Sequence, residues 1–279
     1  MRAQIAFNRP LSSRYRHLGI LAPGFPCAFA AGQFVMVRPP FVTDPFLPRA
    51  FSIYRLSSAD EDAPVVELLY QVIGKGTQRL SRMEPGQRIE LLGPLGNAFA
   101  VPESLDTPVL VAGGIGVPPI AALAAALAKR RRSQATGAPG TAEGCPQTIR
   151  VFLGGKTADD VLCVKDFEAA GATLAAATED GSLGARGLVT DLLEPFLRGA
   201  RHPATAVFTC GPLGMLAAVA RLAEQHGVPC QASVEENMAC GFGACMGCAV
   251  EVRAEGAGPR YKLVCKEGPV FDSRELVWR

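Results

Sequence analysis

Four cysteines near the C-terminus are the residues whose types and spacing point most directly to chemistry. Cys240, Cys245 and Cys248 follow the pattern C-x4-C-x2-C in "ACGFGACMGC", and Cys265 follows in "YKLVC". Thiolates at this spacing are the plant-type ligand set for a [2Fe–2S] cluster. Glycines stand between the ligands, where a loop that curls around inorganic sulfide needs unusual dihedral angles and close approach of N–H groups. The sequence therefore predicts a [2Fe–2S] cluster here.

A structural zinc site is the alternative for the same four thiols. Zinc modules more often use two separated C-x2-C pairs or include histidine. The three histidines, His17, His202 and His226, are remote in the sequence, so we favour the cluster. The other five cysteines are scattered singly and, apart from Cys210, are expected to be structural.

A second group of candidates follows strand-like runs. "VLVAGGIGVPPI" passes from a strand through glycines to a helix start, and "TEDGS" and "FTCGPLGM" follow two further strands. Glycines at such a turn let the backbone approach a pyrophosphate, and ligands of open α/β sheets bind at the carboxyl ends of strands. Taken alone, the first run fits a plain tight turn equally well. The candidates for dinucleotide binding are Gly113, Gly114, Gly116, Glu179, Asp180, Gly211 and Cys210, with a nicotinamide ring expected against Cys210.

A third group lies nearer the N-terminus, in "LPRAFSIY" and "LLYQVIGKGTQRL". Arg49 beside Phe51 and Ser52 would place a phosphate-binding cation next to an aromatic ring. Gly76 and Thr77 precede a short helix, whose first N–H groups favour an anion. The alternative is that Arg49 is a solvated strand charge and Phe51 belongs to the core.

Two regions with different secondary-structure patterns are expected to position these groups. Up to residue 100, short β-rich runs alternate with turn signals, which predicts an antiparallel barrel or sandwich. From 108 to 235, buried strands alternate with helical periods, which predicts a parallel sheet built from βαβ units. A Pro-rich and polar stretch at 97–108 marks the seam, and 236–279 reads as a small cysteine-ligated module. We expect an α+β multi-domain chain, with an exposed loop at 133–147.

The charge balance argues against nucleic acid as a partner. The 28 basic and 26 acidic residues leave a net charge of +2, which provides no electrostatic footprint for nucleic acid. No signal-peptide pattern opens the chain, so we expect reduced thiols and a cytoplasmic location. The uncharged run 109–128 could mimic a membrane span, but its glycines and two prolines suit a strand, a turn and a helix better.

Together, the three groups of motifs resemble the ferredoxin reductase superfamily, and more closely the electron-transfer subunits of two-subunit, NAD-linked dihydroorotate dehydrogenases. The resemblance covers nearly the whole chain and is most specific in "ACGFGACMGCAVEV" and "YKLVCKEGPVF". It implies FAD in the barrel (1–100), NAD(H) on the parallel sheet (108–235) and the [2Fe–2S] cluster in the C-terminal module (236–279).

The resemblance also implies individual roles. Arg49 would pair with the FAD pyrophosphate, Phe51 would lie by the flavin ring, and Ser52 would reach its N5 edge. The remaining residues implied are Leu69, Tyr70 and Gln71 along the flavin and ribityl chain, Gly76 and Thr77 at the phosphates, and Ala50, where this family often has proline.

The implied activity is an electron relay from NADH through FAD and the cluster to a partner subunit that carries FMN, where dihydroorotate and orotate exchange. A heterotetramer with two copies of each subunit is expected, without nucleic acid or membrane. Reductase subunits of hydrogenase, sulfide dehydrogenase and ferredoxin:NADP oxidoreductase resemble the same layout. A non-catalytic redox sensor is the alternative from another class, although it would not need "RAFS" and "GKGT".

Two details depend on single side chains. Glu179 and Asp180 would repel a 2′-phosphate and favour NADH, whereas Lys156 in "GGKT" could act the other way. Phe242 and Met246 are apolar residues on the ligand loop, which should lie near the surface. They either shield the cluster from water or form part of a docking patch for the electron-accepting partner.

Overall fold

The chain forms two compact units. The computed structural model describes residues 1–40, 43–60, 63–135, 148–199, 204–253 and 258–278. Unit 1 comprises Met1–Ala98, Glu235–Val250 and Lys262–Pro269, and unit 2 comprises Phe99–Val234, Glu251–Tyr261 and Val270–Arg279. Each unit is described by itself below.

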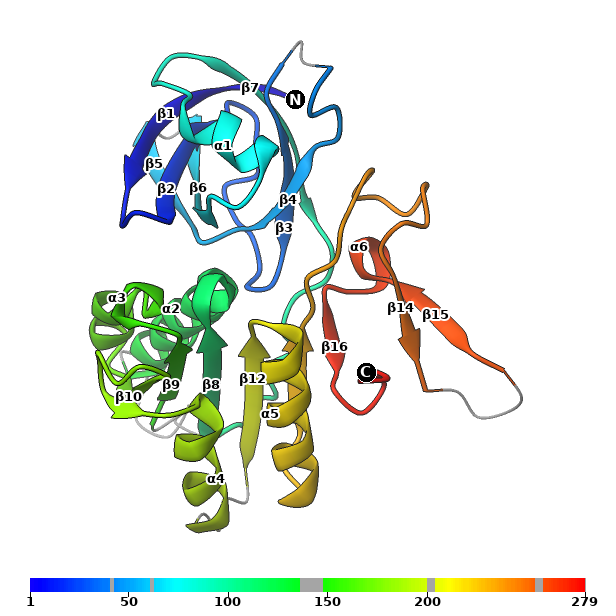
Figure 1. Cartoon of the computed structure of the whole chain (residues 1–279). Helices are drawn as coiled ribbons and strands as arrows, with labels where there is room; N and C mark the ends of the chain where they lie inside the picture. The colour runs from blue at the N-terminus through cyan, green and yellow to red at the C-terminus, as the bar shows by residue number, and fades with distance from the viewer. Residues whose placement is uncertain (41–42, 61–62, 136–147, 200–203, 254–257, 279) are drawn as a thin grey trace. The chain divides into compact units, whose positions relative to one another are not determined.

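Unit 1 is built on a seven-stranded antiparallel sheet with the strand order β4-β3-β7-β1-β2-β6-β5. Its strands are β1 (Arg2–Pro10), β2 (Tyr15–Leu21), β3 (Phe34–Arg38), β4 (Arg49–Ser52), β5 (Arg55–Asp60), β6 (Ala63–Gln71) and β7 (Arg88–Leu95), and helix α1 (Lys75–Ser81) precedes β7. The sheet curls around its own core (Figure 1), which includes Ile5, Leu18 and Leu68. The antiparallel sheet predicted for the first hundred residues is confirmed.

The run "AFSIYRL", which the sequence suggests as one strand, is divided between β4 and β5. β4 pairs with β3, whereas β5 pairs with β6, so the run joins the two ends of the strand order. At the corner, the N–H groups of Ile53 and Tyr54 donate to the carbonyl groups of Gln33 and Glu67. Both corner side chains are buried. This corner brings the sheet edges together, which protects them from pairing with other chains.

A buried carboxylate ties three strands of unit 1 together. Glu67 of β6 is 3% exposed, and its Oε2 lies 2.7 Å from both Arg55 Nε and His17 Nε2. Burial by itself raises the pKa of Glu67, but hydrogen bonds from His17, Ser57 and Arg55 more than offset this and lower the pKa to about 2. The carboxylate therefore stays ionised in the folded chain.

Unit 2 is built on a second seven-stranded sheet, with the order β11-β10-β9-β8-β12-β13-β16. Its strands are β8 (Thr107–Gly113), β9 (Arg150–Gly155), β10 (Thr173–Thr178), β11 (Ala185–Arg186), β12 (Thr205–Cys210), β13 (Cys230–Ser233) and β16 (Val270–Asp272). Every pair is parallel except β13 with β16, which is antiparallel. The parallel sheet predicted for this half is confirmed.

Helices cover both faces of this sheet (Figure 1). They are α2 (Val117–Ala135), α3 (Val164–Ala169), α4 (Val189–Gly199) and α5 (Leu213–Gln225), with single 3-10 turns η1 (Gly114–Gly116) and η2 (Ala158–Asp160). Side chains of α4 and α5, including Leu193 and Val219, share a core with Val109 and Val207 of the sheet. The run 109–128 is divided between β8, η1 and α2, and no helix in the described residues is both long and apolar enough to cross a membrane. Of the loop expected at 133–147, residues 133–135 belong to α2 and the rest lie outside the described residues.

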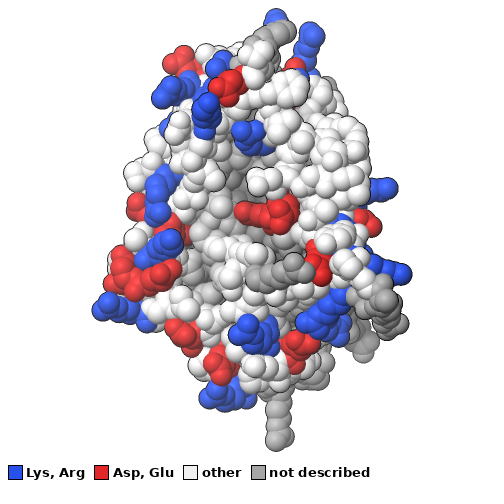
Figure 2. Space-filling view, turned by 45° about the vertical axis from the view of Figure 1, so that its right-hand side comes forward, with Lys and Arg blue, Asp and Glu red and all other residues white. Residues whose placement is uncertain are grey.

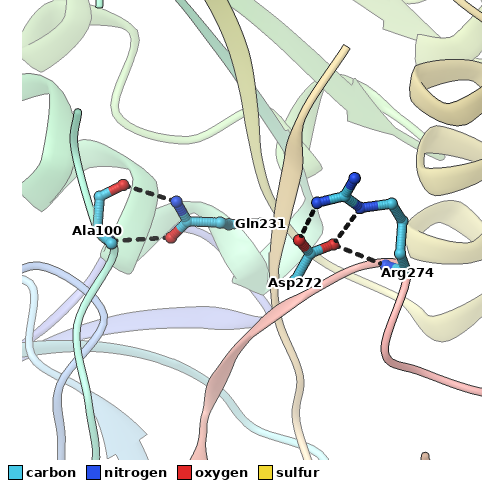
Figure 3. A network of polar contacts seen from close by, with 4 residues as sticks. All are labelled: Ala100, Gln231, Asp272 and Arg274. Carbon is cyan, nitrogen blue, oxygen red and sulfur yellow. Dashed lines mark hydrogen bonds and ion pairs between the residues drawn. The ribbon is translucent and has the colours of Figure 1, made fainter. Parts of the chain in front are cut away.

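The tail after residue 234 is shared between the two units rather than compact by itself. It contains the cysteine loop, the ribbon of β14 (Ala249–Val252) and β15 (Arg260–Leu263), and α6 (Val264–Glu267). β16 then joins the sheet of unit 2 beside β13. Near this edge, the Gln231 side chain forms hydrogen bonds with both backbone groups of Ala100, and Asp272 binds the guanidinium of Arg274 (Figure 3). Residues 236–279 were expected to form a third domain. The two compact units instead divide this segment between them, because β16 pairs with β13 in the sheet of unit 2.

Charges are mixed on the face of the molecule that is visible in Figure 2. Figure 2 shows Lys and Arg side chains interspersed with Asp and Glu. This pattern agrees with the small net charge of +2.

Candidate functional site

The flavin candidates of "RAFS" stand on β4, next to β3. The register places Arg49 opposite Val37 and Phe51 opposite Val35, and both valines belong to the barrel core. Arg49 and Phe51 therefore share the side of the strand that faces the core, with both residues only partly buried, whereas Ala50 and Ser52 point the other way. This alternation gives the cation and the ring a common face, as the sequence predicts.

The two flavin motifs meet although 26 residues separate Arg49 from Lys75. A Cβ atom built on Gly76 would lie 2.8 Å from Arg49 Nε, so the guanidinium lies directly over this glycine. Arg49 Nη1 donates to the carbonyl oxygen of Leu47 at 2.6 Å, which fixes the side chain. Thr77 Oγ1 accepts the N–H groups of Ile73 and Gly74, which orders the turn before α1. A guanidinium held over a turn that lacks a side chain fits a phosphate group.

A basic cavity lies beside this turn in the same unit. It has a volume of about 410 Å³ and is lined by residues that include Lys75, Arg79, Arg82 and Asp44. Lys75 Nζ binds Asp44 Oδ2 at 3.0 Å. Three cations against one carboxylate suit a ligand that carries more than one negative charge.

The residues of "LYQ" occupy three different environments. Tyr70 is 1% exposed inside the barrel core, where its ring centroid lies 5.7 Å from that of Phe51. Burial raises the pKa of Tyr70 to about 12, and its hydroxyl donates to Asn8 Oδ1 at 3.1 Å. Leu69 is buried and Gln71 is half-buried. The structure therefore connects Tyr70 to the flavin face through Phe51.

The glycines of "AGGIG" stand at the point where the strand order of unit 2 reverses. Chain connections run outward from β8 in one direction and from β12 in the other, and ligands of such sheets bind in the crevice between these strands. A Cβ atom on Gly116 would lie 2.5 Å from the carbonyl oxygen of Cys210 and the N atom of Gly211. Gly114 has φ +53°. Gly113 and Gly116 thus approach "CG" at 210–211 because they lack side chains, whereas the role of Gly114 is its left-handed backbone.

The acidic pair Glu179 and Asp180 follows β10, and Lys156 follows the neighbouring strand β9. The N–H groups of Glu179 and Asp180 donate to the carbonyl groups of Gly155 and Lys156. Asp180 Oδ1 accepts the hydroxyl group of Ser182 at 2.6 Å and its N–H group at 2.9 Å, and these two hydrogen bonds lower the pKa of Asp180. The acidic pair and Lys156 thus belong to adjacent strand ends. The Cys210 side chain is fully buried, with its backbone at the strand end.

Asp160 is a positioning residue that the sequence reasoning missed. It is 4% exposed, and its Oδ2 accepts the N–H groups of Lys156 and Thr157 at 3.0 and 3.1 Å. These bonds hold the "GGKT" turn after β9. The spacing of Thr157 and Asp160, a capping pair three residues apart, was the signal that could have identified it.

The cysteine loop lies against the barrel wall within unit 1. A Cβ atom on Gly241 would lie 2.4 Å from Met36 Cγ and 3.2 Å from Leu95 Cδ1, so the loop rests directly on β3 and β7. Asn97, just after β7, donates through its backbone and side chain to the carbonyl groups of Gly268 and Glu267, and thereby holds the segment that carries Cys265. Two distant parts of the sequence are thus fixed to the same wall.

The loop has the backbone that its glycines predict, with one difference. Gly241 and Gly243 have φ +83° and +91°, but the third unusual position is Met246, at φ +60°, rather than Gly247. A Cβ atom at Gly247 would make only an ordinary van der Waals contact, 3.6 Å from Cys245 Sγ. Met246 therefore carries backbone strain in the ligand loop.

The four thiols interact with one another and with backbone donors. Burial raises the pKa of Cys240, but hydrogen bonds from the N–H groups of Phe242, Cys245 and Ala244 and from the Cys245 thiol bring it down to about 6. Burial and the neighbouring Cys248 raise the pKa of Cys265 to about 12, although the Gly243 N–H group opposes this. N–H groups aimed at sulfur fit a loop that holds cluster thiolates.

The described residues contain no group of three or more His, Cys, Asp or Glu side chains gathered tightly enough for one metal ion. A two-iron cluster has a different requirement, because its thiolates are divided between two metal ions. Cys248 and Cys265 are buried, Cys240 is half-buried and Cys245 is exposed. The donor set of four thiols without histidine fits an iron–sulfur cluster.

Known protein families match the parallel-sheet part of the chain and the cysteine-bearing tail. Residues 110–221 match the oxidoreductase NAD-binding domain, and residues 235–277 match the iron-sulfur cluster binding domain of dihydroorotate dehydrogenase B. The dihydroorotate dehydrogenase B (NAD(+)) electron transfer subunit of Desulforamulus reducens is 36% identical over 92% of this chain and 90% of its own length. The corresponding subunit of Caldanaerobacter subterraneus subsp. tengcongensis is 37% identical over 88% and 87%.

Solved structures share the fold. The structure of an NADH-dependent reduced ferredoxin-NADP oxidoreductase, described for flavin-based electron bifurcation, has a TM-score of 0.80 and 25% identity, and the match covers 99% of this chain and 90% of that one. A ferredoxin NADP+ reductase from Neisseria gonorrhoeae with bound FAD and NADP has a TM-score of 0.63 and 19% identity, over 81% and 91%.

The barrel, the parallel sheet and the cysteine-bearing tail define an oxidoreductase of the ferredoxin reductase-like class with a C-terminal iron–sulfur domain. The matched domains confirm an iron–sulfur cluster and NAD(H) among its predicted cofactors. Within that class, the chain belongs to the family of electron transfer subunits of dihydroorotate dehydrogenase B (NAD(+)).

Proposed function

We propose that this chain passes electrons from NADH to the FMN of a dihydroorotate dehydrogenase catalytic subunit. The complex contains two copies of each subunit and works in the cytoplasm, in pyrimidine biosynthesis. Family membership supports the general role, since the relatives carry the name of electron transfer subunits of this enzyme.

One observation carries the proposal. The loop with the cysteines rests on Met36 of β3, and β3 pairs directly with β4, where Met36 lies opposite Ala50 of the flavin motif. The proposed flavin and cluster residues therefore belong to one compact unit and to neighbouring strands. An internal electron relay requires its two sites to be held in one unit.

The residues of the chain divide the remaining tasks. Arg49 and the turn at Gly76 and Thr77 would hold the FAD phosphates, Phe51 would lie by the flavin ring, and Ser52, at the end of β4, would reach its N5 edge. The glycines at 113–116 and at Gly211 leave room for the nicotinamide dinucleotide. When bound, FAD supplies two-electron chemistry with the nicotinamide and one-electron chemistry with the cluster. Cys240, Cys245, Cys248 and Cys265 would ligate that cluster.

The nucleotide is NADH. Glu179 and Asp180 lie at the strand end next to Lys156, and hydrogen bonds from Ser182 hold Asp180 as an oriented anion. A carboxylate in this position accepts hydrogen bonds from ribose hydroxyl groups and repels a 2′-phosphate.

A second candidate is a reductase subunit of a ferredoxin:NADP oxidoreductase. It is favoured by the structural match of TM-score 0.80 over 99% of this chain. The dihydroorotate dehydrogenase role is preferred because identity is 36% to that family and 25% to the ferredoxin-linked structure.

Anaerobic co-purification from the native host tests the choice. A tagged chain should bring down a flavoprotein that oxidises dihydroorotate, and the isolated complex should couple NADH oxidation to orotate reduction. Recovery of a pyridine-nucleotide transhydrogenase or ferredoxin-linked partner, without dihydroorotate activity, would replace the first candidate by the second.

A further inference from the structure

An open apolar groove lies on the outer wall of the barrel in unit 1. Its volume is about 530 Å³, and its lining includes Phe46, Leu47, Leu92, Met36 and Phe242. Phe46 and Phe242 are 63% and 59% exposed, and Leu47 and Leu92 are 46% and 43% exposed. Large apolar side chains gathered around one hollow, rather than scattered singly, mark an interaction surface.

The groove reaches the proposed cluster site. Cys240 and Ala239 of the ligand loop line it together with β3 and β7 of the barrel. A molecule seated in the groove would therefore touch a proposed cluster ligand and the barrel wall at the same time. Met246 lies on the same ligand loop and is 61% exposed, but it does not line the groove.

The charges at the rim indicate the chemistry of the occupant. Arg2 and Arg38 line the groove with one carboxylate, that of Glu90. Glu90 Oε2 already accepts Arg38 Nε at 2.7 Å. The rim thus has an excess of positive charge around an apolar floor, which complements an apolar anchor flanked by acidic side chains.

We propose that this groove is the docking site for the electron-accepting subunit, which inserts an apolar anchor beside acidic residues. The proposal rests on the proposed function and adds the barrel wall to the interface. The groove is continuous with the ligand loop, so docking there brings the acceptor next to the cluster. Phe46 and Leu92 then contribute to binding although they take no part in holding a cofactor.

The test measures binding of cluster-replete, FAD-replete protein to the purified dihydroorotate dehydrogenase catalytic subunit. Phe46→Glu and Leu92→Glu should each weaken binding at least about tenfold, because each buries a charge in an apolar contact. Leu11→Glu is the matched control, since Leu11 is 48% exposed in the turn between β1 and β2 and does not line the groove. NADH reduction of the bound FAD should be unchanged in all three variants.

The outcomes separate the two proposals. Groove variants that bind as tightly as Leu11→Glu overturn the docking site, whether or not substitutions at Met246 weaken binding. If light scattering shows a dimer of this chain that Phe46→Glu dissociates while partner binding is retained, the occupant is a second copy and the inference is wrong. Failure of the wild-type protein to bind the catalytic subunit would instead overturn the proposed function.

Discussion

Substitution of Gly76 by alanine should weaken FAD binding without weakening the fold. The new Cβ atom would lie 2.8 Å from Arg49 Nε and 3.0 Å from its Cζ and Nη2, closer than ordinary contacts allow. The guanidinium must move, because the backbone of α1 is fixed by its own hydrogen bonds. Alanine is meanwhile a better helix residue than glycine by up to about 1 kcal/mol. Stability of the apoprotein and FAD affinity should therefore change in opposite directions.

The magnitude follows from the contact that is displaced. A charge-assisted hydrogen bond contributes about 1.5 to 3 kcal/mol, which corresponds to roughly ten- to a hundredfold in affinity. Arg49→Ala removes the contact and should show the full loss. Gly76→Ala only shifts the guanidinium, so we expect a loss of about tenfold. The double variant should bind FAD no more weakly than Arg49→Ala alone, because the two changes act on the same contact.

Titration of deflavinated protein with FAD, followed by flavin fluorescence, measures these affinities. Gly74→Ala is the matched control, since Gly74 has extended backbone at φ −160° and no atom within 4 Å of the built Cβ. Iron content should be the same in every variant. Retention by Gly76→Ala of an FAD affinity within about twofold of wild type, or an equal loss in Gly74→Ala, would refute a phosphate contact through Arg49.

Three further outcomes are expected. Serine at any of the four proposed cluster ligands should lower the iron content of anaerobically purified protein, whereas Cys27→Ser should not; equal loss in all five would contradict the ligand set. Because the folded-state pKa of Glu67 is about 2 and its ordinary value is 4.5, its stabilisation is present above about pH 4.5 and is lost as the pH falls toward 2. Urea unfolding should find Glu67→Gln about 3 kcal/mol less stable than the wild type at pH 7, and its free energy of unfolding should change less with pH between about 4.5 and 2. A pH dependence parallel to that of the wild type would argue against this role of Glu67. Gly116→Ala, which meets backbone atoms at 2.5 Å, should raise the KM for NADH and lower stability, whereas Gly214→Ala, with open space around it, should do neither.

Features that are set by residues close together in the chain, such as the cysteine loop and the types of secondary structure, were predictable from the sequence. The spacing of Cys240, Cys245 and Cys248 predicts a cluster loop because ligands a few residues apart must converge locally, whereas Cys265 follows on a separate segment. The periodicity of hydrophobic residues distinguished the antiparallel half of the chain from the parallel half, because this periodicity reports which side of each strand or helix is buried. The positive φ values of Gly241 and Gly243 follow in the same way from a tight loop.

Contacts between distant residues were decided only by tertiary structure. Arg49 lies over Gly76, Gly116 lies against Cys210, and the loop at Gly241 rests on Met36. The corner at Ile53 and Tyr54 and the return of β16 to the sheet of unit 2 were likewise invisible in local patterns. Strand pairing and close packing depend on which surfaces complement one another after the chain has collapsed, and periodicity within one segment carries no information about its partner.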